Sequence, residues 1–400
     1  MRTMYMALVL TAVVIMAGFY LDLHYCNQTS QHIITKRIVF GGEEPGHASL
    51  RLSASYEIKV YRRGELVAVR HKEDDPITIH WYRMVANMMF GFIRDGALTW
   101  LDTGGSPRKW ADTEDHGLNP VMYVALGSGV GTPSINDHKL FNEEVKDKAE
   151  MNVEDDIVNQ RYTVMFTKTF TITQAFTLTE VGLILKVDTN IGTGSSYAYL
   201  LVAHDMVSPP VDLVENDAVA VTYIITIPYN VNGPFTKWFY HALINYWLGY
   251  LGTAGRYLEM KYEGGANGRI DTAYDRYGGS SHDRVKGEYT YVEIGSGSSS
   301  SNPLFEVYKL EALVKRIRID GPQFANSIDE DGNYTIKYVV GFASTTATTI
   351  REIGVTYYTD VKSDNYLGSY YLWLYWIIPE ISIGAGDGLR VEIVITIPYT

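Results

Sequence analysis

Apolar and polar residues alternate along most of the chain after residue 52, which is the pattern of β-strands with one buried face. In the first half this alternation predicts strands at 121–126, 162–173, 177–185, 198–203 and 218–227. In the second half it predicts strands at 289–294, 335–342, 348–357, 370–378 and 390–397. A hairpin made of 53–60 and 65–70 precedes them around an Arg-Gly turn. The chain is therefore expected to be mainly β.

Two segments, 76–93 and 234–251, depart from this alternation. Each begins at a proline and then carries apolar residues at three- and four-residue spacing, which predicts an amphipathic helix. We expect each helix to pack on a sheet.

Four short motifs occur twice and in the same order, which predicts two homologous modules. The pairs are 75–78 with 233–236, 127–129 with 295–297, 179–183 with 351–355, and 224–229 with 394–399. Each module is expected to be an antiparallel β-sandwich of jelly-roll type, the first over 48–229 and the second over 230–400. The residues that define the repeat are Gly127, Gly129, Glu180 and Gly182 in the first module and Gly295, Gly297, Glu352 and Gly354 in the second.

The N-terminal segment 1–47 is expected to lie outside both modules. Residues 4–21 form an unbroken apolar stretch behind Arg2, long enough for a hydrophobic helix that crosses a membrane. Bulky residues after Gly18 leave no clean cleavage site, so an uncleaved anchor competes with a signal peptide. Residues 22–47 are interpreted as a linker or arm. Asn27 and Asn333 stand in glycosylation sequons, which are compatible with an external location.

The net charge, the cysteine count and the tyrosine content restrict the classes of function expected for this chain. The formal net charge of −12 argues against nucleic acid as a partner. A single cysteine, Cys26, excludes an intrachain disulfide framework and any multi-cysteine metal site. The 31 tyrosines favour extended contact surfaces, because a tyrosine ring is apolar and its tip is polar.

The motifs that bear on chemistry favour a protein that is not an enzyme and has no cofactor. The Gly-rich turn 127–131 superficially resembles a phosphate-binding loop, but no lysine or helix follows it, and a tight turn is the favoured interpretation. Asp329, Asp331 and Asn333 have the donor spacing of a calcium loop, yet the closing acidic residue is absent, which favours a solvated acidic turn.

Glu180 and Glu352 stand at the same place in both modules, each in an apolar strand beside a glycine. A buried ionised carboxylate is costly unless it is paired or accepts hydrogen bonds from backbone amides. We therefore expect each glutamate to fix a turn or a neighbouring loop, with no partner visible for catalysis.

A run of aromatic residues near the C-terminus predicts an aromatic stripe on one face of a strand. Its members are Tyr371, Trp373, Tyr375 and Trp376. Such a stripe fits either a contact with another subunit or stacking on a glycan, and the subunit contact is favoured.

The order of motifs over residues 50–229 resembles the N-terminal or collar-type domains of tailed-phage tail fibre proteins. The motifs are the hairpin residues 64–67, the turn 127–131, Thr-Pro-Ser at 132–134, Leu-Phe-Asn-Glu-Glu at 140–144 and Thr-Glu-Val-Gly-Leu at 179–183. The second module matches the same pattern less fully. The resemblance implies a structural virion or tail component and supplies no catalytic residues.

The sequence therefore predicts a virion surface or tail protein, exported or held in a membrane through residues 4–21. Its expected partners are further copies of itself, other virion or surface proteins, and a host glycan or receptor. A cellular surface-layer or pilus-like adhesin with a glycan-binding aromatic surface is the alternative.

Overall fold

The computed structural model describes residues 33–39, 52–89, 99–108, 120–190, 195–231, 233–254, 258–261, 263, 267–268, 290–298, 304–319, 324–328, 334–360 and 368–397. Over these residues the chain is mainly β, with several antiparallel sheets and short helices. The prediction of a mainly β protein is confirmed.

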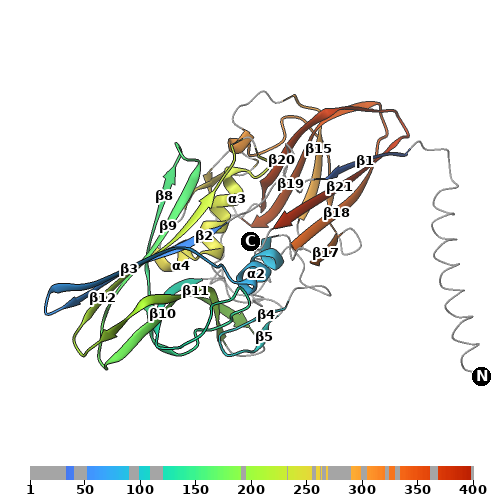
Figure 1. Cartoon of the computed structure of the whole chain (residues 1–400). Helices are drawn as coiled ribbons and strands as arrows, with labels where there is room; N and C mark the ends of the chain where they lie inside the picture. Colours follow the sequence, from blue (N-terminus) through green and yellow to red (C-terminus); the bar gives the residue numbers. More distant parts are fainter. Residues whose placement is uncertain are drawn as a thin grey trace, which may run out of the picture.

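The first half of the chain forms two sheets around an apolar core (Figure 1). One sheet has the order β3-β2-β12-β9-β8 and the other the order β11-β10-β6-β7. Their strands are β2 (Ser53–Arg62), β3 (Glu65–Asp75), β6 (Val121–Gly127), β7 (Glu143–Lys148), β8 (Glu150–Asp156), β9 (Arg161–Thr171), β10 (Phe176–Asn190), β11 (Ser195–Leu213) and β12 (Ala218–Pro228). Tyr56 and Phe166 from the first sheet and Leu183 from the second are buried in the core.

The second half forms another two sheets, with the orders β16-β15-β19-β20 and β1-β21-β18-β17. Their strands are β1 (Ile33–Val39), β15 (Thr290–Gly295), β16 (Leu313–Arg318), β17 (Phe324–Ile328), β18 (Tyr334–Ala343), β19 (Thr348–Asp360), β20 (Gly368–Ile383) and β21 (Gly388–Ile397). One continuous cluster of buried side chains runs through both pairs of sheets.

The strands β6 to β12 and β15 to β21 follow one another in the same order and pair in the same way. The two long hairpins, β10–β11 and β19–β20, even share their irregularities. These fall at Leu178/Glu180 and Leu183/Ile184 in the first hairpin and at Ile350/Glu352 and Val355/Thr356 in the second.

Strand β1 is the exception to this correspondence. It runs parallel to β21, with a register from Ile33 opposite Gly388 to Val39 opposite Val394. In the first half the place beside β12 is taken by β2, which is antiparallel. The sequence predicted only a linker or arm over 22–47, so this strand was missed.

In each half, the two residues that follow the proline at the start of the helical segment pair with a strand of a sheet. Ile77 forms a bridge with Ala203 of β11, and Thr78 N donates to Val202 O at 2.8 Å before α2 (Ile79–Met89) begins. In the second half Phe235 bridges to Leu374 of β20, and Thr236 N donates to Trp373 O at 3.0 Å.

The second predicted helix is broken, so the prediction of one continuous amphipathic helix there is wrong. It consists of α3 (Lys237–Ala242), a π-helical turn η1 (Leu243–Trp247) and α4 (Tyr250–Ala254). Gly249 causes the break, because its φ of +74° is unfavourable for other residues and a Cβ there would lie 2.8 Å from Pro120 O. Helix α3 packs on β20 and α4 packs on β6 and β8, so this segment joins the two pairs of sheets.

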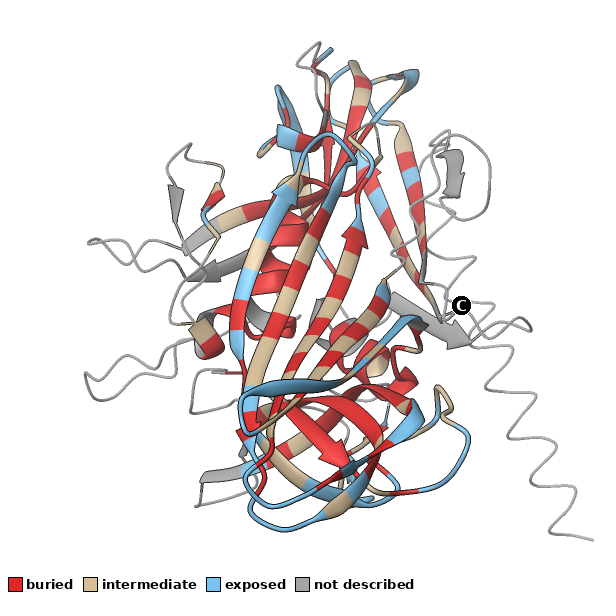
Figure 2. Ribbon diagram, turned by 60° about the vertical axis from the view of Figure 1, so that its left-hand side comes forward, coloured by how far each residue is buried: buried red, intermediate tan, exposed pale blue. Residues whose placement is uncertain are grey.

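Burial alternates along the strands, as Figure 2 shows, and this alternation is the reason the sequence predicted them. Strands β7 and β8 at sheet edges were missed because most of their residues are charged or polar. Short elements complete the described chain: β4 (Trp100–Leu101), β5 (Pro107–Arg108), β13 (Met260–Lys261), β14 (Asn267–Gly268) and a 3-10 turn η3 (Leu304–Glu306). No helix in the described ranges has the length and apolar character needed to cross a membrane.

Candidate functional site

Glu180 on β10 is fully buried and accepts three hydrogen bonds from backbone amides. Oε1 accepts from Gly129 N at 2.9 Å and from Asn142 N at 2.7 Å, and Oε2 accepts from Phe141 N at 2.9 Å. The amides belong to the two ends of the loop between β6 and β7. The carboxylate therefore closes this loop over the end of the sheet.

Glu352 on β19 does the same in the second half of the chain. Oε2 accepts from Gly297 N at 3.0 Å and from Ala312 N at 3.3 Å, while Oε1 accepts from Glu311 N at 3.1 Å. Like Glu180, it is fully buried. The prediction that each glutamate fixes a neighbouring loop is confirmed by these contacts.

Glycines make room for the two carboxylates. Glu180 stands opposite Gly127 in the sheet, and a Cβ at Gly127 would lie 2.4 Å from Glu180 Oε1. Glu352 stands opposite Gly295, where a Cβ would lie 2.5 Å from Glu352 Oε2. The glycines of the repeated motif are therefore required by close approach of a side chain.

The fourth partner differs between the halves. The residue opposite Gly182 is His204, whose Nε2 lies 2.9 Å from Glu180 Oε2. The residue opposite Gly354 is Tyr375, whose hydroxyl donates to Glu352 Oε1 at 2.6 Å. The strand position opposite Gly182 or Gly354 thus supplies a hydrogen-bond donor to the glutamate in both halves. The donor is an imidazole in the first half and a phenol hydroxyl in the second.

His204 is held between two carboxylates. Its Nδ1 lies 2.8 Å from Asp137 Oδ2, so both ring nitrogens face acceptors and both must donate. Burial acts to lower the pKa of His204, but the bonds to Glu180 and Asp137 outweigh it and raise the pKa above its usual value. Burial likewise acts to raise the pKa of Glu180, and the bonds from His204 and the amides lower it. The cluster is therefore an ion pair with an additional carboxylate.

The contacts of Glu180 and His204 are those of a structural cluster that holds a loop in place. The ring of Phe141 packs edge-on against His204 with centroids 4.8 Å apart, and Glu180 and His204 are both inaccessible to solvent. Two amides of the turn at 127–131 already have acceptors within the protein, because Gly129 N donates to Glu180 and Ser128 N donates to Asn142 O. The interpretation of that turn as a non-phosphate loop agrees with these contacts.

A second polar cluster, with two buried aspartates, joins β3 to β11 in the first half. Lys72 Nζ contacts Asp205 Oδ2, and the carboxyl groups of Asp75 and Asp205 are neighbours. Tyr223 donates to Asp75 Oδ2 at 2.8 Å. Burial first, and then the neighbouring Asp205, raise the pKa of Asp75 to about 9, so the pair holds one proton at neutral pH. No sequence pattern predicts this pair, because its members are far apart along the chain.

The predicted aromatic stripe is not on the surface, and the prediction of an exposed interface or glycan platform there is wrong for this face. Its four residues are all buried: Tyr371, Trp373, Tyr375 and Trp376. Trp373 stacks on Tyr357 with centroids 4.6 Å apart and meets Trp247 of η1 edge-on. On the other face, Tyr375 packs with Val307 and Leu310. The helical segment and a loop cover both faces, which alternation along one strand does not reveal.

Several predicted residues lie outside the described ranges. They are the apolar segment 4–21, the sequon residues Asn27 and Asn333, and the calcium candidates Asp329, Asp331 and Asn333. No group of acidic, histidine or cysteine side chains suited to a metal ion occurs in the part of the chain that the structure describes.

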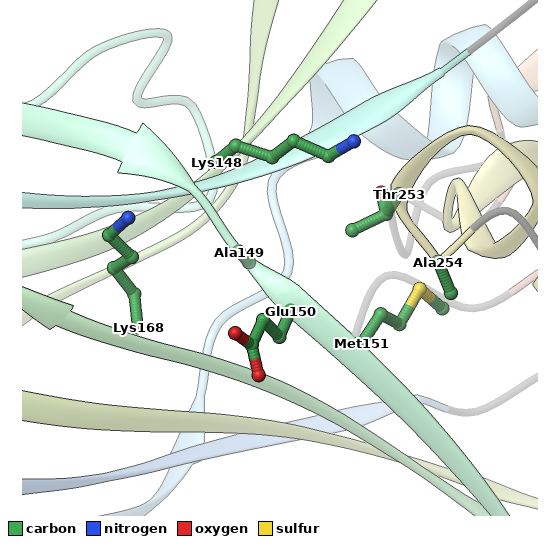
Figure 3. A pocket seen from close by; sticks show the side chains of 7 residues that line it. All are labelled: Lys148, Ala149, Glu150, Met151, Lys168, Thr253 and Ala254. Atoms are coloured by element: carbon green, nitrogen blue, oxygen red, sulfur yellow. The ribbon is translucent and has the colours of Figure 1, made fainter.

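A shallow pocket of about 490 Å³ lies between β8, β9 and α4 (Figure 3). Lys148, Glu150 and Lys168 line it together with apolar residues and Thr253. Lys168 contacts Asp147, and Thr253 Oγ1 accepts a hydrogen bond from Met122 N at 2.9 Å. Two of the polar lining side chains, Lys168 and Thr253, are therefore already engaged in contacts with other residues.

No protein family, curated protein or solved structure was found to match this chain. Its resemblance to tail fibre domains therefore remains a prediction from the motifs.

Glu180→Gln and Glu352→Gln are each expected to lower the free energy of unfolding by about 2–4 kcal/mol, because an amide NH₂ replaces an acceptor that two donors face. Urea unfolding followed by tryptophan fluorescence measures this change. Glu380→Gln, at an exposed carboxylate paired with Arg351, is the control and should change stability by less than about 0.5 kcal/mol. Equal effects for all three variants would contradict the assignment.

The stabilisation from His204 is expected to depend on pH. Since its folded pKa lies above the reference value of 6.5, the stabilisation is fully present below pH 6.5 and is lost as pH rises through the folded pKa. The difference in unfolding free energy between the unmodified chain and His204→Gln should therefore shrink from acidic to alkaline pH. A difference that stays constant or grows with pH would contradict this, and His71→Gln at an exposed site serves as the control.

Proposed function

We propose that this chain is a structural protein of a virion surface or tail, exported or held in a membrane by its N-terminal apolar segment, and assembled with further copies of itself. The proposal includes the finer view of the fold, in which two duplicated β-sandwich modules of jelly-roll type follow one another. The matching strand order, the shared irregularities and the paired glutamate contacts support the duplication.

The observation that carries the assembly proposal is the addition of β1 to β21. A strand that pairs along a sheet edge through backbone hydrogen bonds is a general means of joining chains. Strand β1 contacts the second pair of sheets, while β2, the next strand along the chain, belongs to the first pair. Only residues 40–51 and Leu52 connect the two strands. A neighbouring copy can therefore supply β1 with the same register, which would link the subunits.

Contacts between the two pairs of sheets support a rigid subunit of a larger assembly. The segment 237–254 packs on both pairs of sheets, and Trp81 Nε1 donates to Trp247 O at 3.0 Å across the junction. Tyr229 stacks on Phe305 with centroids 4.6 Å apart. These contacts favour a rigid unit, which transmits load between subunits without bending.

Apolar residues at two turns provide surfaces for contacts with other proteins. Ile157 and Val158, at the tip of the β8–β9 hairpin, are 73% and 91% exposed, and Val130 in the β6–β7 loop is 87% exposed. Exposed apolar residues gathered at loop tips are typical of protein contacts. A cellular surface-layer or pilus-like adhesin would use the same features, but the buried aromatic residues give no support to its glycan-binding surface.

Cysteine cross-linking tests assembly through β1. Thr35 and the exposed Arg390 are register partners, so a chain carrying Cys26→Ser, Thr35→Cys and Arg390→Cys should form disulfide-linked multimers on oxidation. Non-reducing gel electrophoresis separates these from monomers. The matched control carries Thr35→Cys with Glu380→Cys on β20, and it should form fewer linked chains. Only intrachain disulfides in the first variant would contradict assembly by strand exchange.

Labelling tests the virion assignment independently. Immunogold labelling with antibody against the full chain should place gold on virus particles. Gold confined to the envelopes of uninfected cells would contradict the virion assignment and favour the cellular adhesin.

A further inference from the structure

The cluster of Lys72, Asp75 and Asp205 brings together an amine, a carboxyl group and a second carboxyl group. Lys72 and Asp75 lie near the end of β3, at the edge of the five-stranded sheet, and Asp205 lies on β11, at the edge of the four-stranded sheet. Any bond between them would therefore join the two sheets of the first sandwich.

The register of β3 directs Lys72 toward the interior. Lys72 is the partner of Tyr56 and Asp75 is the partner of Ala54, and both partners on β2 are buried. Since paired residues of adjacent strands lie on the same face, the stem of Lys72 runs inward even though its side chain is 47% exposed. Its Nζ reaches Asp205, whose side chain is almost fully buried.

One oxygen atom of each carboxyl group has no hydrogen-bond partner. Asp205 Oδ1 accepts a hydrogen bond from Met206 N at 2.6 Å, whereas Oδ2 contacts Lys72 Nζ without the geometry of a hydrogen bond. Asp75 Oδ2 accepts from Tyr223, and its buried Oδ1, beside Asp205, has no hydrogen-bond partner. The amine thus faces the carboxyl group itself, with a protonated acid beside it.

We propose that Lys72 and Asp205 form an intramolecular isopeptide bond, with Asp75 as the proton-transferring acid. One proton of the Lys72 ammonium passes to Asp205 Oδ2, Nζ attacks Cγ of Asp205, and the bond from Cγ to Oδ2 then breaks. Asp75 protonates the departing oxygen, which leaves as water, and takes back the proton that the nitrogen loses. The ammonium and carboxylate together thus become one amide and one water, and Asp75 ends as it began.

The surroundings favour this condensation. The Asp205 carboxyl group is almost fully buried and therefore loses much of its hydration at the point where the Lys72 amine meets it. The fold holds the two groups in contact, which removes the entropic cost of bringing them together. Burial and the neighbouring Asp205 keep Asp75 protonated at neutral pH, as its role requires.

The second half of the chain lacks these groups. Gly233 precedes Pro234 where Asp75 precedes Pro76, and Trp376 follows the bridging Leu374 at the place where Asp205 follows Ala203. The proposed bond is therefore particular to the first sandwich, and it does not depend on whether the chain belongs to a virion.

Intact-mass spectrometry of the full chain under denaturing conditions tests the bond. The mass should fall below the value for the sequence by one water molecule. Tryptic digestion should then yield residues 71–83, uncleaved after Lys72, joined to residues 187–237, which contain Asp205. A mass equal to the sequence value with cleavage after Lys72, or a water loss that maps to another site, would overturn the proposal.

Variants separate the roles of the three residues. Lys72→Arg and Asp75→Asn should each abolish the water loss, whereas the control Lys59→Arg, at an exposed lysine paired with Glu57, should retain it. Circular dichroism of each variant establishes that it has folded. Persistence of the linked peptides in folded Asp75→Asn would overturn the role of Asp75, and their persistence after Lys72→Arg would overturn the bond.

Discussion

In each half of the molecule, the arrangement of a loop on its sheet depends on one interaction. A buried carboxylate accepts hydrogen bonds from the backbone amides of that loop. An ionised glutamate without partners would be costly in an apolar sandwich. Glu180 and Glu352 avoid this cost because three amides and one side chain donate to each. In return, each carboxylate holds both ends of a loop on the sheet. The glycines opposite the glutamates, Gly127 and Gly295, leave room for the carboxylates.

The side chain that donates to the buried glutamate differs in charge between the two halves. In the first half His204 donates to the glutamate and carries a positive charge, which Asp137 supports from its other side. In the second half the hydroxyl of Tyr375 donates and is neutral. The two halves therefore share the geometry of this contact but differ in the side chain that supplies the donor. The buried Asp75 and Asp205, with Lys72 beside them, are a further difference, since the second half has Gly233 and Trp376 at the positions of the two aspartates.

Much of this architecture was predictable because it follows from local pattern. Strands such as β9 and β12 alternate strictly, and a glutamate in an apolar strand beside a glycine indicates a structural acceptor. What could not be predicted depends on contacts between distant residues. His204 lies 67 residues from Asp137, and only the register of β10 and β11 brings it to Glu180. The aromatic residues of β20 were misplaced for the same reason, since alternation identifies the faces of a strand but not the helix and loop that cover them. Strand β1 was missed because its partner β21 is at the other end of the chain.

Amide hydrogen exchange measured residue by residue tests the central claim most directly. The claim predicts that the amides of Gly129, Phe141 and Asn142, and those of Gly297, Glu311 and Ala312, exchange as slowly as the central amides of β10 and β19, because a buried carboxylate holds them until the sandwich unfolds. Exchange at the rates of open loops in either half would contradict the account.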